Sequence, residues 1–231
     1  LVITNGAVAN GASNQTHANL DGFTLKVNGE GAKGISVEGG AHASISDLTT
    51  VQLTGENSIL AKVDGWYYDI NGLHQSAQDG LSLLTSSATL TSRVVTGQIS
   101  VGYYLTNGGK LSHSGSVLFT SPSLNNIGVK IDSGGTLISE SGSSVKVSGT
   151  AVEISGSTSL ATINNIANGS GDPVIWAVGS TNSDAAYHVK DQANLTLTGA
   201  GLTKAEGSAH GILVDGASRI TLDGAKLDLY G

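Results

Sequence analysis

Gly128-Val-Lys-Ile-Asp-Ser-Gly-Gly-Thr-Leu-Ile138 is the stretch that decides the fold. Apolar and polar residues alternate on both sides of a glycine-containing turn, which predicts two short strands joined by that turn. The same pattern returns near the start as Gly34-Ile-Ser-Val-Glu-Gly-Gly-Ala-His-Ala-Ser-Ile45 and near the end as Gly211-Ile-Leu-Val-Asp-Gly-Ala-Ser-Arg-Ile-Thr-Leu222. A pattern that recurs along a chain in this way predicts a repeat protein.

The interval between successive copies measures the length of one coil. Copies of the pattern begin at Gly102, Gly128 and Ala151, so the intervals are similar but not equal. Ala186-Tyr-His-Val189 and Gly211-Ile-Leu-Val214 are separated by an interval of the same size, which places His188 opposite Leu213. Coils of about 22–26 residues with short strands are typical of a parallel β-helix. We therefore expect an all-β single domain over 1–231, a solenoid with about nine or ten coils and almost no helix.

The alternation within each strand predicts which side chains point into the coil. One coil has too few aliphatic side chains to bury them alone. Coils stacked about 4.8 Å apart would build a continuous apolar column in a rod of about 45 Å. The predicted inward positions are Val37, Leu105, Ile131, Ile154, Val189 and Val214.

Two segments interrupt the repeat, and we expect loop insertions in both. The step from Ala151 to Ala186 is longer than one coil, which predicts about ten extra residues within 164–185. Two registers fit residues 56–80. Gly34, Gly80 and Gly102 are spaced as whole coils would require, but Gly65-Trp-Tyr-Tyr68 also matches Gly102-Tyr-Tyr-Leu105 and would imply an insertion. Insertions on a solenoid map to one face and often carry binding.

The composition excludes several classes of protein. The chain has 33 Gly, no Cys and a formal net charge of −7, with no run of lysine or arginine. Nucleic-acid binding is disfavoured because it needs a basic surface. The absence of cysteine removes disulfides and thiolate metal sites and is compatible with export through an oxidising compartment. No stretch is long and apolar enough for a membrane-spanning helix.

The coil motif resembles the β-helical passenger domains of bacterial autotransporters (type V secretion), of the pertactin-like kind. The runs that carry the resemblance are GISVEGG at 34–40, GVKIDSGG at 128–135, AVEISG at 151–156 and GILVDGASRITLDGA at 211–225. The resemblance implies a right-handed parallel β-helix that is exported through the periplasm to the bacterial cell surface. It also implies a role as an adhesin or aggregation factor, in a passenger segment of a longer protein.

Motifs with catalytic precedents are interpreted as structural. Gly29-Glu-Gly-Ala-Lys-Gly34 has the spacing of a dinucleotide loop, but a strand follows where that site needs a helix. Asp132-Ser-Gly-Gly135 has the order of a serine-protease nucleophile segment, yet the equivalent turn reads Thr106-Asn-Gly-Gly109. The six histidines lack the i, i+4 spacing of a metal site. We therefore expect no catalytic residue, no metal and no cofactor.

The aromatic residues are the better candidates for a binding site. They are scarce, and adjacent residues on a strand point to opposite faces, so at least one of each pair should point outwards. Exposed tryptophan and tyrosine stack on sugars or anchor protein partners. The candidate ligand-binding residues are Trp66, Tyr67, Tyr68, Asp69, His74, Tyr103 and Tyr104, with loop contacts from Asn168, Asp172 and Trp176.

The favoured hypothesis is a cell-surface or secreted adhesin without catalysis. Its partner would be a host matrix protein or glycan, or an identical rod on a neighbouring cell, with no nucleic acid and no membrane insertion of this segment. A carbohydrate-active lyase or hydrolase is the alternative, because pairs of acids such as Asp64 and Asp69 have the chemistry of a glycosidase. An inert structural stalk is the third hypothesis.

Overall fold

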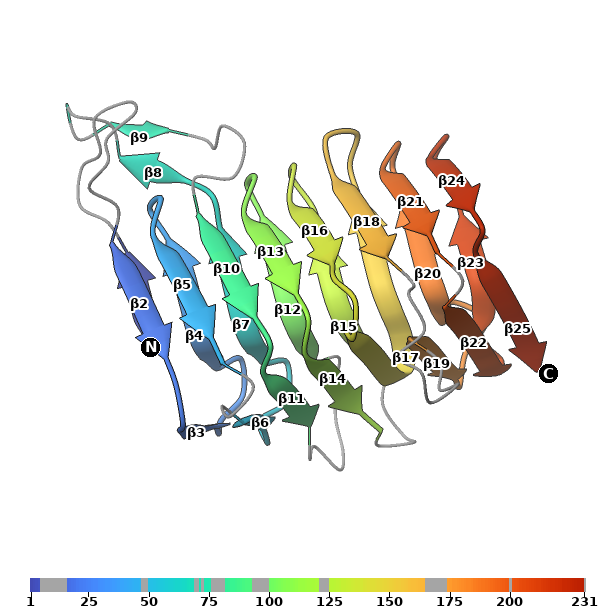
Figure 1. Cartoon of the computed structure of the whole chain (residues 1–231), viewed down its shortest axis with the longest axis horizontal. Helices are drawn as coiled ribbons and strands as arrows, with labels where there is room; N and C mark the ends of the chain where they lie inside the picture. Colours follow the sequence, from blue (N-terminus) through green and yellow to red (C-terminus); the bar gives the residue numbers. More distant parts are fainter. Residues whose placement is uncertain are drawn as a thin grey trace.

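The computed structural model describes residues 1–4, 16–46, 50–68, 71, 73–75, 82–92, 100–120, 125–164, 174–199 and 201–230. Within these residues all regular structure is β, as predicted, and there is no helix. Parallel strands stack as a β-solenoid of about seven turns, with the two termini at opposite ends of the rod (Figure 1). Each coil contributes strands to three faces, here called faces A, B and C.

Face B forms its own eight-stranded sheet and lies towards the viewer in Figure 1. Its strands are β2 (His17–Leu20), β5 (His42–Ile45), β10 (Leu83–Ser86), β13 (Lys110–His113), β16 (Thr136–Ser139), β18 (Leu160–Asn164), β21 (Asn194–Thr198) and β24 (Arg219–Asp223).

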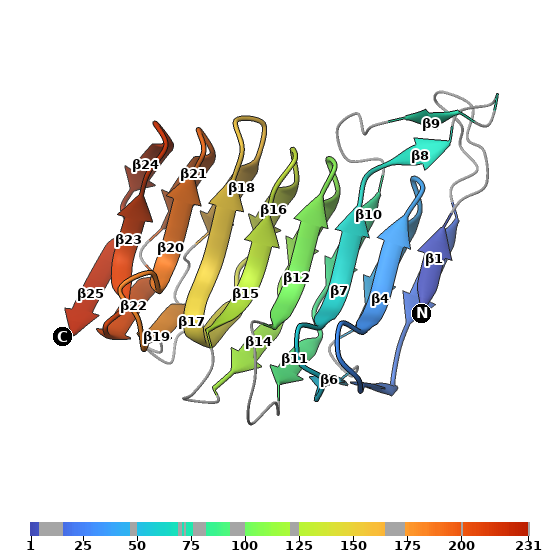
Figure 2. The same ribbon diagram turned by 180° about the vertical axis from the view of Figure 1, so that it is seen from behind.

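Faces A and C are joined through the long strand β17 (Ser144–Ser155), whose two halves belong to different faces. Face A, seen in Figure 2, also contains β1 (Val2–Thr4), β4 (Lys33–Glu38), β7 (Ile59–Asp64), β12 (Val101–Thr106), β15 (Asn126–Ile131), β20 (Ala185–Lys190) and β23 (His210–Val214). Face C also contains β3 (Thr24–Val27), β6 (Thr50–Leu53), β11 (Thr89–Ser92), β14 (Ser116–Phe119), β19 (Ile175–Gly179), β22 (Leu202–Gly207) and β25 (Lys226–Tyr230).

The strand register confirms most of the predicted spacings. Tyr103 pairs with Val129 and Val129 with Val152, which are the same steps that separate the copies beginning at 102, 128 and 151. Val152 pairs with Tyr187 across the predicted long step. His188 pairs with Leu213, as predicted.

The predicted number of coils is wrong, and strand β7 fixes the register that the sequence left open within 56–80. Ala61 pairs directly with Tyr103, so β7 occupies the coil position before β12 and neither of the two registers considered from the sequence holds. An insertion follows β7 and includes the antiparallel hairpin of β8 (Tyr67–Tyr68) and β9 (His74–Gln75). Dividing the length by a uniform period overcounts coils when insertions take up residues. Seven steps of about 4.8 Å give a rod of about 34 Å instead of about 45 Å.

The core is the predicted aliphatic column. Val37, Leu105, Ile131, Ile154 and Val189 are all fully buried. Val214 is 46% exposed, although it pairs with Val189 in the expected register. Its strand belongs to the last described coil of face A, so no further described strand covers it there. The predicted register of Val214 is therefore correct, but the prediction that its side chain is buried is wrong.

The turn after the motif strand needs left-handed backbone. Ser133 and Gly134 have φ values of 48° and 82°, and the equivalent Asn107 and Gly108 have 49° and 76°. Two successive residues with positive φ make a tight turn that glycine and asparagine tolerate best. Ser133 occupies a turn position that holds asparagine one coil earlier, which agrees with the structural interpretation of Asp132–Gly135.

The first glycine of the motif is required by the distance between coils. A Cβ at Gly128 would lie 2.6 Å from the carbonyl oxygen of Ala151 in the next coil, and a Cβ at Gly34 would lie 2.5 Å from that of Leu60. Glycine lets the backbones of neighbouring coils approach closely here.

Candidate binding groove

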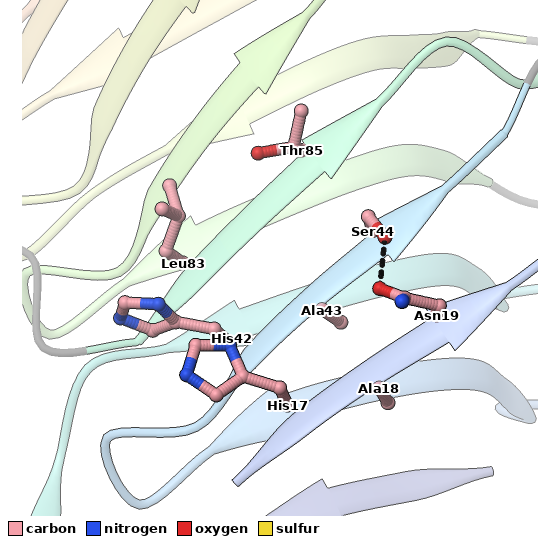
Figure 3. Close-up of a pocket in the computed structure, with 8 residues that line it drawn as sticks. All are labelled: His17, Ala18, Asn19, His42, Ala43, Ser44, Leu83 and Thr85. Atoms are coloured by element: carbon pink, nitrogen blue, oxygen red, sulfur yellow. Dashed lines mark hydrogen bonds between the residues drawn. The ribbon is translucent and has the colours of Figure 1, made fainter. Parts of the chain in front are cut away.

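A shallow groove crosses the outer surface of face B at the first four described coils. One hollow of about 160 Å³ is lined by His17, Asn19, His42, Ser44, Leu83 and Thr85, together with the inward-pointing Ala18 and Ala43 (Figure 3). A second hollow of about 310 Å³ shares Asn19, Ser44 and Thr85 and extends to Asp21, Ser46, Ser87 and Ser114. The shared lining makes the two hollows one continuous feature, which we call the face-B groove.

Strand alternation puts these side chains on the surface in rows. His17 pairs with His42 and His42 with Leu83, so these three form one row across the coils. Asn19, Ser44 and Thr85 form the next outward row along the strands. The second row is made of short side chains, so the surface is low there beside the larger histidines.

Hydrogen bonds between coils fix the floor of the groove. The Ser44 hydroxyl donates to Asn19 Oδ1 at 2.8 Å, and the Ser46 hydroxyl donates to Asp21 Oδ1 at 2.6 Å (Figure 3 shows the first of these). The Asn19 amide nitrogen belongs to an exposed residue, so it has access to solvent. Donors and acceptors are therefore held by rigid strands and presented to the outside.

The two histidines meet at one end of the groove. Their ring centroids are 5.1 Å apart with an interplanar angle of 88°. Figure 3 shows both rings side by side, next to Leu83. The sequence offered a signal for this pair, because the interval from His17 to His42 equals the interval from Ala186 to Gly211.

The inserted hairpin lies at the same end of the rod as the groove. In both ribbon views β8 and β9 cover the end of the first coils where β2, β5 and β10 begin (Figures 1 and 2). Trp66 is half-buried, and Tyr67 is only 8% exposed, so Tyr67 is a poor candidate for ligand stacking. The predicted site residue Asp69 and the side chains of Tyr68 and His74 lie outside the described residues.

The adjacent Tyr103 and Tyr104 point to opposite sides of β12. Tyr103 is fully buried, and its hydroxyl is 2.6 Å from that of Ser86, so the prediction that it binds a ligand is wrong. Tyr104 lies on the outer side of face A between Lys62 and Lys130, whose Nζ atoms are 5.9 and 5.7 Å from its ring centroid. Its hydroxyl donates to Asp132 at 2.8 Å, and burial together with that carboxylate raises the pKa of Tyr104 to about 12.

Trp176 belongs to strand β19 and not to a loop, which corrects the prediction. It lies on face C between Lys146 and Lys204, whose Nζ atoms are 3.4 and 4.5 Å from its ring centroid. Its indole nitrogen donates to Glu206 at 2.8 Å, and Lys204 lowers the pKa of that carboxyl. Two cations of the chain itself therefore already contact the ring. The other two predicted loop contacts, Asn168 and Asp172, lie outside the described residues.

The acidic residue proposed for a glycosidase pair is engaged in the scaffold. Asp64 is 3% exposed, lies 2.5 Å from Lys62 Nζ and accepts a hydrogen bond from Asn107 at 2.9 Å. Among the described residues no group of three or more histidine, cysteine or acidic side chains has the arrangement of a metal site.

No helix among the described residues is long and apolar enough to cross a membrane. Comparison of the chain with protein-family models, with curated proteins and with solved structures gave no match.

Proposed function

We propose that this chain is a non-catalytic adhesive module that binds a glycan in the face-B groove. The observation that carries the proposal is the continuous hollow across the first four described coils, lined mainly by amide, imidazole, carboxylate and hydroxyl side chains, with Leu83 beside the histidines. The resemblance of the coil motif to autotransporter passenger domains supports a place on the bacterial surface, where such a module would attach the cell to host glycans.

The chemistry of the lining suits a polyhydroxylated ligand. Asn19, Ser44 and Thr85 lie one per coil, about 4.8 Å apart across parallel strands. Amide and hydroxyl groups can donate to and accept from sugar hydroxyls, and Leu83 offers an apolar surface for the face of a sugar ring. A ligand lying across the strands would meet a new polar group at each coil.

The rigidity of the scaffold favours recognition by such weak contacts. The strands β5 and β10 are paired on both sides, so their side chains are held in place before a ligand arrives. A shallow groove leaves much of the ligand in solvent, so we expect weak binding per site. Display of many copies on one cell would raise the overall avidity.

A glycan array probed with the purified chain tests the proposal, with binding strength then measured on the best ligand. The paired change Asn19→Ala and Ser44→Ala should weaken binding by about tenfold or more, which corresponds to two lost hydrogen bonds. The matched control is Thr162→Ala with Thr196→Ala, because these residues occupy the same row of face B in later coils and also pair with each other.

Equal weakening in both variants, or binding to no glycan, would contradict the groove proposal. Reducing-sugar release from the bound glycan would contradict the absence of catalysis. Sedimentation of the purified chain without any glycan measures whether it self-associates. The result distinguishes an adhesin that binds host glycans from one that binds a second copy of itself. A concentration-dependent dimer that the Asn19→Ala and Ser44→Ala changes dissolve would assign the groove to self-association instead.

A further inference from the structure

We infer that His17 and His42 together form a binding site for a divalent transition metal such as Zn²⁺, Ni²⁺ or Cu²⁺ at the rim of the face-B groove. The inference rests on the geometry of the histidine pair and does not depend on glycan binding. Imidazole nitrogen is a preferred ligand for each of these ions.

The separation of the two rings matches a shared ion. A zinc–nitrogen bond is about 2.0–2.1 Å long, and the ring centre lies about 1.2 Å behind the nitrogen, so each centroid would lie about 3.2 Å from the ion. At a tetrahedral angle, two such centroids are about 5.2 Å apart. The observed separation is 5.1 Å, so the two rings lie at a distance that a shared ion requires, and rotation of the side chains would turn their nitrogens towards it.

The backbone holds the pair at this distance. His17 and His42 are register partners on the parallel strands β2 and β5, and β5 is itself paired with β10. The two ligands are therefore presented together by a paired sheet, and only side-chain rotation is needed to bring the nitrogens onto the ion. Such preorganisation reduces the entropic cost of binding both ligands at once.

The pair is also accessible. His17 is exposed and His42 is half-buried. The next residue of the row is Leu83, which supplies no ligand. Two coordination positions of a tetrahedral ion would therefore be filled by water or by a group of another molecule.

None of the other described histidine side chains lies opposite another histidine in the strand register. His113 is fully buried in the core, and that burial lowers its pKa to about 4. His188 Nε2 lies 3.0 Å from Asp215, and His210 Nε2 lies 3.0 Å from the carbonyl oxygen of Asn182. His188 and His210 belong to neighbouring coils but are not register partners, because His188 pairs with Leu213 and His210 with Ala185.

Titration of the full chain with Ni²⁺ and with Zn²⁺, followed by calorimetry and by the imidazole nitrogen resonances, tests the site. We expect one ion per chain and shifts confined to His17 and His42. The single variants His17→Ala and His42→Ala should each weaken binding on the order of 10- to 100-fold, because a chelate is reduced to one ligand. Binding should also fall as the pH is lowered, because a metal ligand must be unprotonated imidazole.

The variant His188→Ala with His210→Ala is the matched control and should bind as the parent does. Both altered pairs lie on outer faces, so far-ultraviolet circular dichroism and the thermal midpoint show whether each variant is folded. Unchanged affinity in the His17→Ala and His42→Ala variants would overturn the inference. Equal loss in the control variant, or resonance shifts spread over all histidines, would overturn it as well.

Discussion

The inside of the solenoid and its outer faces are built from alternate residues of the same strands, yet they follow different rules. The inward column of face A reads Ala61, Tyr103, Val129, Val152 and Tyr187, and every member is buried. The neighbouring outward row reads Lys62, Tyr104, Lys130, Glu153 and His188. The inward side chains must fill the limited volume between the coils. The outward side chains only need suitable contacts with their neighbours in the row.

The difference explains where a binding site can be placed. A change of side chain inside a coil alters the packing with the coils above and below it, because interiors are close-packed. On an outer face a shorter side chain merely lowers the surface. The face-B groove has this form, with serine, threonine and asparagine beside histidine. Ion pairs such as Lys190 with Glu153, at 3.2 Å, cover other parts of the outer faces.

The largest effect should come from truncating the inward column. Leu105 is fully buried in a central coil, so Leu105→Ala should lower the free energy of unfolding by about 2–5 kcal/mol, through lost burial and the cavity left behind. Urea denaturation measures this change. Thr85→Ala, in the groove and exposed, is the matched outward change and should stay within about 0.5 kcal/mol. Similar losses for the two variants would contradict the comparison.

Because His113 is buried in the core, the free energy of unfolding should depend on pH. Burial lowers its folded pKa to about 4, below the ordinary value of about 6.5 expected in the unfolded chain. The unfolded state therefore binds more protons between these values. Stability should be fully present above about pH 6.5 and should fall by about 3 kcal/mol as the pH drops through 4.

Urea denaturation at a series of pH values checks this, with His113→Leu as the comparison. The leucine variant should lose the part of the slope that lies between about pH 6.5 and 4. Carboxylates also titrate near the lower end, so the difference between the two chains is the informative quantity. Parallel pH profiles would show that His113 becomes protonated without cost to the fold.

The sequence predicted the inside far better than the outside, for physical reasons. Period-2 alternation and the glycine turn identified Ile131 and Ile154 as buried and placed His188 opposite Leu213. The coil count was wrong, because a uniform period was applied to the whole length although residues of the long step from Ala61 to Tyr103 form no coil of their own.

The groove was not predicted, because it is made by residues that are distant along the chain and unremarkable in type. Only the register brings His17 to His42 and Asn19 to Ser44, and the first coil had no clear copy of the motif from which to read it. The sides of the adjacent aromatic pair could have been predicted. The alternation that places Leu105 inwards also places Tyr103 inwards and Tyr104 outwards, so the burial of Tyr103 followed from the predicted core.

That tyrosine pair supplies the smallest and sharpest comparison, because the same atom is removed from neighbouring residues. Tyr103→Phe leaves a buried Ser86 hydroxyl without its partner at 2.6 Å and should cost about 1–2 kcal/mol. Tyr104→Phe removes the hydrogen bond to Asp132 on an outer face, where water can replace it, and should cost about 0.5 kcal/mol. Urea denaturation of both variants checks the order. A larger loss for Tyr104→Phe would mean that the contacts between Tyr104, Asp132 and the two flanking lysines stabilise the coils as strongly as the core does. Substitutions on the outer face would then cost more stability than the contrast between inside and outside predicts.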